Sequence, residues 1–267
     1  MSTSPSTIKI ELQGGVARVT LARPDVHNAF NDTMIRELTE AFSDLGARED
    51  VRVVVLAGEG RSFSAGADVE WMRSAATRTE EENLADASRL AAMLGAIDGC
   101  PKPVVVRVQG AALGGGVGLM ACGDVVVAAR DARIGTTEVR LGILPAVISP
   151  FVLRKIGYGR ARAHFVLGDR FDAGWAFQIG LVHRLVDHEA DLDTAVHDVV
   201  QQLLAGGPAA QAETKRLLGR LLADPSAESQ TRTTVETIAR VRVSDEGREG
   251  LGAFLEKRKP RWHPPAS

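Results

Sequence analysis

A cluster of glycines between residues 110 and 118 contains the residue types from which a site for negative charge can be built. The cluster follows the apolar run 104–108 and precedes a short apolar stretch, which is typical of a strand that turns into a helix. Glycine lets the backbone approach a ligand closely, and the first amides of a helix lack partners within it. These amides and the helix dipole favour developing negative charge. Glycines that only permit tight packing would give the same pattern.

The same cluster fits the short dinucleotide-binding pattern G-x-G-x-x-A at residues 116–121, with Glu138 at the spacing expected of a ribose-binding acid. In a dinucleotide-binding unit, however, the helix is long and the acid ends the next strand. Here Gly123 interrupts the helix, and the next apolar run ends near Ala129, well before Glu138. No Gly-Lys-Ser/Thr follows the glycines, which excludes a P-loop. We therefore reject a nucleotide-phosphate site of either kind.

A second loop, residues 60–68, places small residues and a glycine where the chain turns from a strand ending at Leu56 into a helix. It resembles half of an oxyanion hole, and two amides from separate strand-to-helix turns can converge on one oxygen atom. Ser62 and Ser64 suggest a nucleophile, but the chain has no G-x-S-x-G and no histidine motif near them. We expect both serines to be turn formers.

The elements that must position these loops follow from the apolar patterns. Up to Pro145, strands alternate with helices, and later segments read as helices, which indicates an α/β core with an α-helical C-terminal part. The patterns predict a hairpin of strands 8–12 and 16–21, a helix capped by Asn31 or Asp32, a helix over 80–97, a short helix over about 115–123, and buried strands at 51–56, 104–108 and 125–129. They also predict helices near 146–156, 159–167 and 172–179, a strand at 181–186, and helices over 190–257 broken at 206–208 and 224–225.

Composition excludes several classes of protein. The 267 residues are 45% hydrophobic and 25% charged, which suits one large domain, or one domain with a helical appendage. A net charge of −2 and only eight Phe, three Trp and one Tyr argue against a nucleic-acid surface. No apolar stretch has the length of a membrane span, and the start lacks a secretory pattern. The two cysteines form no framework and the histidines show no ligand spacing, so we expect a cytoplasmic protein without a metal.

Six short segments together resemble the enoyl-CoA hydratase/isomerase (crotonase) family. They occur in the expected order and cover almost the whole chain: 21–29, 63–68, 110–116, 121–124, 138–145 and 254–257. Any one of them is a weak signal, but the ordered set is specific. Within the family, the chain is most similar to the bacterial methylglutaconyl-CoA and carboxygeranoyl-CoA hydratase type, through residues 67–72, 114–119 and 145–150.

The resemblance implies a crotonase-like spiral of β-β-α units over residues 1–195 and a helical oligomerisation region over 196–267, assembled as a homotrimer or a dimer of trimers. It implies an acyl-CoA thioester as substrate, so that coenzyme A is part of the substrate and no cofactor is needed. The amides of Ala67 and Gly115 would bind the thioester oxygen, and Glu138 would transfer the proton. Further substrate or coenzyme A contacts would come from Ala65, Gly66, Asp68, Val69, Gly114, Gly118, Arg140, Phe254 and Lys257.

One departure from the family pattern leaves the reaction open. Hydratases of the family usually carry a second glutamate just after the glycine cluster, where this chain has Gly118. We expect a hydratase in which Glu138 alone orients water, with a double-bond isomerase using one carboxylate as the alternative. A non-catalytic acyl-CoA-binding or scaffold protein is the alternative from another class.

Three other positions have competing interpretations. Arg140 could pair with a carboxylate on a branched, acidic acyl group, or it could be a solvated or interface arginine. Asp68 is better interpreted as a helix cap than as a ligand. Glu70 stands where relatives often place a lysine near the coenzyme. The resemblance places Phe254 and Lys257 at the nucleotide end of coenzyme A. The coenzyme they contact could be bound to the same subunit or to a neighbouring one.

Overall fold

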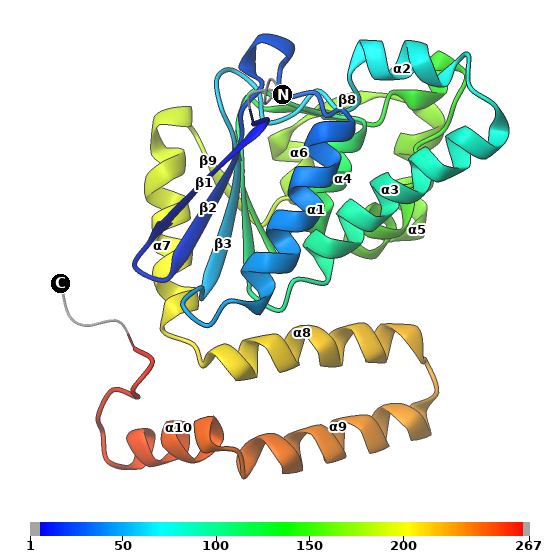
Figure 1. Ribbon diagram of the computed structural model, residues 1–267. Coiled ribbons are helices and arrows are strands. Elements are labelled where there is room, and N and C mark those ends of the chain that lie inside the picture. Colours follow the sequence, from blue (N-terminus) through cyan, green and yellow to red (C-terminus); the bar gives the residue numbers. More distant parts are fainter. Residues whose placement is uncertain (1–5, 264–267) are drawn as a thin grey trace, which may run out of the picture.

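The computed structural model describes residues 6–263 and is built around a six-stranded sheet (Figure 1). The strand order is β1-β2-β3-β4-β6-β9. β1 and β2 are antiparallel and the other pairs are parallel. The strands are β1 (Ile8–Gln13), β2 (Val16–Leu21), β3 (Val53–Gly58), β4 (Val104–Val108), β6 (Val125–Ala129) and β9 (Arg184–Val186). The predicted hairpin is confirmed, and its turn uses Gly14 and Gly15 at positive φ.

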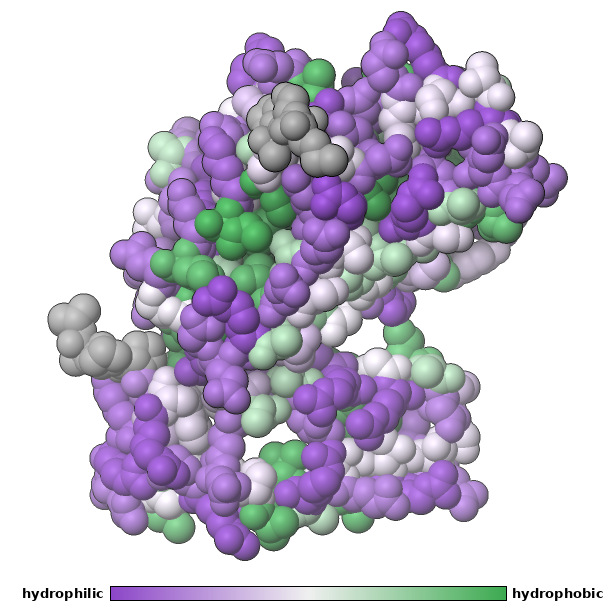
Figure 2. Space-filling model, viewed as in Figure 1, coloured by the Kyte–Doolittle hydropathy of each residue, from purple (hydrophilic) through white to green (hydrophobic). Residues whose placement is uncertain are grey.

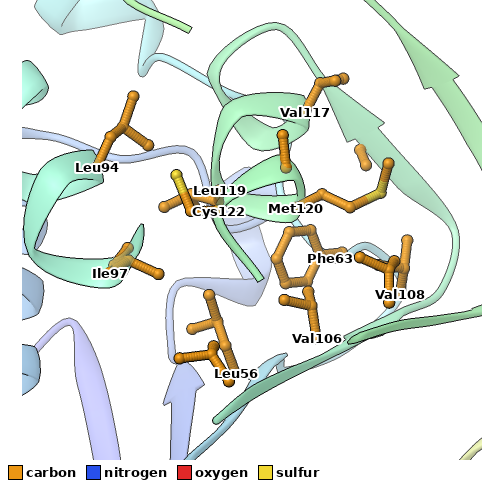
Figure 3. Close-up of a cluster of buried hydrophobic side chains, with 14 of the residues drawn as sticks. Leu56, Phe63, Leu94, Ile97, Val106, Val108, Val117, Leu119, Met120 and Cys122 are labelled. Atoms are coloured by element: carbon orange, nitrogen blue, oxygen red, sulfur yellow. The ribbon is translucent and has the colours of Figure 1, made fainter. Parts of the chain in front are cut away.

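Helices cover both faces of this sheet. On one face lie α1 (Asp32–Ala47), α3 (Glu80–Asp98), α4 (Gly115–Cys122) and α5 (Ser149–Leu167), and on the other lies α7 (Leu192–Leu204) (Figure 1). The Asn31 side chain accepts a hydrogen bond from the amide of Met34 and so caps α1 as predicted. Figure 3 shows Leu56 and Val106 of the sheet facing Ile97 of α3 and Leu119 of α4 in the larger core. This core fixes the strand that leads into the glycine cluster.

A second, three-stranded sheet carries the glycine cluster and was not predicted. It consists of β5 (Ala111–Leu113), β7 (Arg133–Gly135) and β8 (Arg170–Asp172), in that order. Strands of three residues are too short to show a periodic pattern. β5 and β7 are parallel, so the segments that follow them emerge at the same edge of the sheet.

The region after Pro145 differs in detail from its predicted pattern. The two helices expected at 146–156 and 159–167 form α5, which begins at Ser149 and is interrupted by Gly157, whose φ is 76°. The expected helix at 172–179 is α6 (Ala173–Gln178), and the strand expected at 181–186 is confined to β9. Short elements connect these parts: η1 (Pro24–Val26), α2 (Val69–Ala75), η2 (Glu138–Leu141) and η3 (Glu189–Asp191).

The C-terminal helices form an arm that projects from the core (Figure 1). The arm consists of α8 (Pro208–Ala223), α9 (Ala227–Arg242) and α10 (Asp245–Leu255). The breaks predicted at 206–208 and 224–225 are confirmed, and Ser244 caps α10 after a further break. The expected division at residue 195 falls inside α7, which packs on the sheet. None of the described helices is long and apolar enough to cross a membrane.

Candidate active site

A cavity of about 500 Å³ lies between α2, α3, α4 and η2. Ala67, Gly115 and Glu138 all line it, so three positions that the sequence singled out meet in one place. The remaining walls are mostly apolar. They come from Phe30, Trp71, Ala75, Ala87, Leu90 and the segment 143–148.

The two predicted loops run side by side at the floor of this cavity. An isolated parallel bridge joins Ser64 to Ala112, with Ser64 N donating to Ala111 O and Leu113 N donating to Ser64 O. A Cβ atom added to Gly66 would lie 2.6 Å from Leu113 O and 3.1 Å from Gly115 N. Gly66 also has a φ of 86°, which L side chains rarely adopt. Glycine at this position is therefore what lets the loops meet.

The amide of Ala67 is left outside the hydrogen bonds of its own loop. The bridge between Phe30 and Ala67 uses the carbonyl of Gly66 and the amide of Asp68, which bond to Phe30 N and Phe30 O at 2.8 and 3.1 Å. In a parallel bridge the amide of the central residue points the other way. The Ala67 N–H therefore points away from Phe30, and Ala67 lines the cavity.

The amide of Gly115 belongs to the first turn of α4, where helical N–H groups have no partner within the helix. Gly114 precedes it with a φ of 52° and donates its own amide to Gly135 O at 2.8 Å, across the second sheet. A side chain at Gly115 would overlap Phe30 Cζ, a residue of the cavity wall. Because Gly114 and Gly115 have no side chains, the start of α4 can lie close to the cavity.

Glu138 is the first residue of η2, three residues beyond the end of β7. Its Oε1 lies 3.3 Å from the position of a Cβ added to Gly114, so the carboxyl faces the start of α4 rather than solvent. Its Oε2 is buried and has no hydrogen-bond partner in the described chain. Burial raises the pKa of Glu138 above the usual carboxyl range, against a smaller opposing effect of a backbone hydrogen bond. A partly buried acid with a buried, unpaired oxygen and a raised pKa is suited to general acid–base chemistry.

Gly118, by contrast, faces the interior rather than the cavity. A Cβ atom added there would overlap Ile148 Cγ2 and lie 3.0 Å from Ile148 Cβ. Ile148 itself lines the cavity. The place where the family's second glutamate was expected is therefore filled by an apolar side chain from the start of α5.

Two polar residues of the cavity, Asn83 and Asp86 on α3, were missed. Asp86 is only 3% exposed, accepts a hydrogen bond from Arg89, and lies 3.4 Å from Nη1 of Arg78. One available signal was its position on the buried face of the helix, one turn before Leu90. A charged residue on an apolar helix face requires a partner or a function.

Several of the other predicted contacts lie on the loop around Ala67 and at the start of α2. Asp68 accepts a hydrogen bond from the amide of Glu70 at 2.8 Å and so caps α2, which confirms its interpretation as a helix cap. Burial would raise the pKa of Asp68, but the hydrogen bond from Glu70 and the Arg23 guanidinium outweigh it and hold that pKa below its usual range. Ala65, Gly66 and Val69 flank the Ala67 loop, and Glu70 forms an exposed ion pair with Arg73.

Arg140 and the C-terminal residues do not reach the cavity within this chain. Arg140 is exposed and lies against Gly168, outside the cavity lining. Phe254 is 79% exposed on α10, at the end of the arm remote from α2 (Figure 1). Lys257 follows it with a φ of 55°.

Comparison with known proteins gives the family. The family model for enoyl-CoA hydratase/isomerase matches residues 11–265. The chain belongs to the enoyl-CoA hydratase/isomerase family. It is 34% identical to a putative enoyl-CoA hydratase of Thermus thermophilus over 94% of this chain and 98% of that protein. It is 30% identical to the putative enoyl-CoA hydratase/isomerase YhaR of Bacillus subtilis over 96% of this chain and 98% of that one.

Solved structures show that this family member has the crotonase fold predicted from its motifs. An enoyl-CoA hydratase from Shewanella pealeana superposes with a TM-score of 0.92 at 42% identity, covering 96% of each chain. A putative enoyl-CoA hydratase/isomerase (crotonase) from Legionella pneumophila gives 0.90 at 40% identity, covering 97% of this chain and all of the other. Pseudomonas aeruginosa AtuE gives 0.92 at 35% identity, covering 96% and 99%.

Proposed function

We propose that the protein is an enoyl-CoA hydratase that adds water across the 2,3-double bond of an enoyl-CoA thioester. The observation that carries this proposal is the free, buried carboxyl oxygen of Glu138 in the same cavity as the amides of Ala67 and Gly115. The names of the relatives support the reaction class.

The two amides would stabilise the charge that develops on the thioester oxygen. Attack of water at the β-carbon gives an enolate-like state, and that charge needs donors already in place. The start of α4 adds the positive end of a helix dipole. Each such donor typically lowers the barrier by about 3–4 kcal/mol.

Glu138 would then supply both proton transfers. As a carboxylate it orients and deprotonates the attacking water, and as a carboxylic acid it returns the proton to the α-carbon. Its raised pKa brings the two protonation states closer in free energy at neutral pH. No cofactor enters this cycle.

The contact between Gly118 and Ile148 favours a second candidate, a 3,2-enoyl-CoA isomerase. An isomerase needs one base that moves a proton from the α- to the γ-carbon, and it needs no second acid. The apolar wall at Ile148 agrees with that requirement. Asp86 is a second carboxylate of the cavity, but it lies on α3 rather than at position 118.

The acyl group and the coenzyme contacts are part of the proposal. The motif match favours a branched or carboxylated acyl group, of the methylglutaconyl-CoA or carboxygeranoyl-CoA type. Coenzyme A would leave the cavity along the loop of Ala65, Gly66, Asp68 and Val69. Phe254 and Lys257 would contact its nucleotide end from a neighbouring subunit.

A homotrimer or a dimer of trimers would cover the arm. The arm exposes large apolar side chains, visible as green patches at its surface (Figure 2). They include Leu218, Leu222, Val235, Ile238, Val243 and Leu251. Light scattering of the purified protein tests this assembly. The buried free thiols of Cys100 and Cys122 suit the reducing cytoplasm that we propose as its location.

The deciding experiment follows a 2-enoyl-CoA and a 3-enoyl-CoA separately, with wild type and Glu138→Gln. A hydratase converts the 2-enoyl thioester to the 3-hydroxyacyl thioester, and Glu138→Gln loses this activity. Conversion of the 3-enoyl to the 2-enoyl thioester without gain of water identifies the isomerase. Binding without turnover of straight, branched and carboxylated thioesters identifies a non-catalytic acyl-CoA-binding protein.

A further inference from the structure

Glu138 lies on a short element, η2, that few interactions of its own hold in place. η2 contains four residues, none of them buried, and no side chain caps it. Its main-chain bonds are local: Arg140 N donates to Thr137 O at 3.0 Å and Ile143 N donates to Glu138 O at 3.3 Å. The free Oε2 shows that the carboxyl is not fixed through that oxygen. The position of the acid therefore depends on what lies behind η2.

Behind η2 lies the corner at residues 168–170, between α5 and β8. A Cβ atom added to Gly168 would lie 2.7 Å from Val139 Cγ2 and 3.3 Å from Arg140 Cγ, so η2 rests directly on this corner. On the strand before Glu138, a Cβ atom at Gly135 would lie 2.6 Å from Asp169 O. β8 also pairs with β7 along its whole length. A shift of the corner would carry the acid with it.

One buried side chain, His164, ties this corner together. It lies on the last turn of α5 and is 9% exposed. Its Nδ1 lies 2.9 Å from Asp169 Oδ1 in the corner, and its Nε2 lies 3.0 Å from Nε1 of Trp175 on α6. Its ring packs against Phe171 of β8 with centroids 4.4 Å apart. One imidazole thus connects the end of α5, the corner, β8 and the start of α6.

The hydrogen bonds also fix the state of the ring. An indole N–H can only donate, so Nε2 of His164 must accept and Nδ1 must carry the proton. Asp169 then accepts from Nδ1. Both ring nitrogens of a neutral imidazole are satisfied in a single orientation. This arrangement gives a rigid brace, and His164 does not line the cavity.

We propose that His164, through Asp169 and the corner at 168–170, is a positioning residue that holds η2 and thereby sets the place of Glu138 in the cavity. The proposal rests on the proposed function for its kinetic readout. Its structural readout, the order of η2, does not depend on which reaction the enzyme performs.

The test compares His164→Leu with a matched control, His183→Leu. The ring of His183 accepts a hydrogen bond from Val126 N at 3.0 Å in the six-stranded sheet, so its loss removes a histidine brace elsewhere in the fold. His164→Leu should lower kcat by about 10- to 100-fold, the range expected when a catalytic group is misplaced by about 1 Å. KM should change much less, because the amides and the acyl walls are intact. His183→Leu should leave kcat unchanged.

Hydrogen exchange provides the readout that does not need turnover. The peptide covering 136–145 should exchange faster in His164→Leu and at the wild-type rate in His183→Leu. His164→Asn, whose amide can donate to Asp169 as Nδ1 does, should recover much of both properties. If His164→Leu does not fold, Trp175→Phe removes the indole donor but keeps an aromatic ring at a side chain that is 43% exposed, and it should give smaller shifts of the same sign.

The outcomes separate the two proposals. Unchanged kcat and unchanged exchange at 136–145 in a folded His164→Leu would overturn the brace. Equal effects of His164→Leu and His183→Leu would do the same, because they would indicate general destabilisation. A wild-type protein that turns over no enoyl-CoA would overturn the proposed function, while the exchange comparison would still decide the brace.

Discussion

Ile148 occupies the space that any side chain at Gly118 would need. Gly118→Glu should therefore destabilise the protein, because enlarging a packed core position costs about 1–3 kcal/mol even without burying a charge. Urea unfolding followed by circular dichroism measures the change.

The matched control for that variant is Gly95→Glu, on the exposed side of α3. A Cβ atom there meets nothing within 4 Å. A glycine replaced by a better helix former in open space should leave stability equal or higher. If Gly118→Glu proves as stable as Gly95→Glu and raises the hydration rate, Ile148 does not prevent a second glutamate from occupying this position.

Replacing Glu138 by Gln should lower kcat by about 10²- to 10⁴-fold, the usual contribution of a general acid–base group. In the wild type, kcat/KM for hydration should rise as the pH passes the pKa of Glu138, because the carboxylate is the base. Burial raises that pKa. The midpoint should therefore lie above that of an ordinary glutamate, and a midpoint at or below the ordinary value would contradict it.

Glu138→Gln, which should lower activity, should raise the stability of the protein at neutral pH. Because the folded-state pKa of Glu138 is raised by burial, its ionisation opposes folding. The penalty is absent below the unfolded-state pKa, grows as the pH rises toward the folded-state pKa, and is complete above it. Glu138→Gln should thus gain stability over wild type at neutral pH and lose that advantage in acid. Parallel unfolding curves at both pH values check the sign.

Gly66→Ala should impair catalysis beyond its cost in backbone strain. Gly66 has a φ of 86° and lies against Leu113 O and Gly115 N. Gly14 has a φ of 58° with nothing within 4 Å, so Gly14→Ala carries a similar strain of about 1–2 kcal/mol without the crowding. Both variants should melt at lower temperature. Only Gly66→Ala should lower kcat/KM, and equal activity in the two would argue that the loops need not touch.

Asp86→Leu should change which acyl groups are preferred. A carboxylate that is 3% exposed at the wall of a mostly apolar cavity disfavours long apolar chains that reach it. The ratio of kcat/KM for a long straight-chain substrate to that for a four-carbon substrate should rise severalfold in the variant. This ratio is independent of how much enzyme is folded, which matters because Arg89 and Arg78 lose a partner. An unchanged ratio would place the acyl chain away from α3.

The long, periodic elements could be predicted from the sequence, and the site could be predicted mainly from the resemblance. The α1 helix and the β1–β2 hairpin follow from apolar spacing and from caps such as Asn31. The second sheet does not, because its pairings join three-residue strands whose partners lie far apart in the chain. Nothing local to Glu138 shows that it begins a 3-10 helix beside Gly114.

Two site residues show how tertiary contacts decide what local sequence cannot. Arg140, two positions from Glu138, had two interpretations, a contact to an acidic acyl group or a solvated arginine, and the short turn of η2 leaves it exposed against Gly168. Asp86 lies 52 residues before Glu138 in sequence numbering. It reaches the same cavity because α3 packs against both α1 and α4. Asp86 could have been chosen as a site residue only with knowledge of how α3 packs.

Gly115 and Glu138 follow neighbouring parallel strands, and the bond from Gly114 N to Gly135 O joins their ends. Adjacent strands are about 4.8 Å apart in any sheet, so backbone pairing brings the starts of α4 and η2 together, and the corner behind η2 then holds the acid in place. The walls contributed by α2 and α3 stand outside that pairing. Changes in α2 and α3 can therefore fit the enzyme to new acyl groups while the reacting end of the pocket keeps its dimensions.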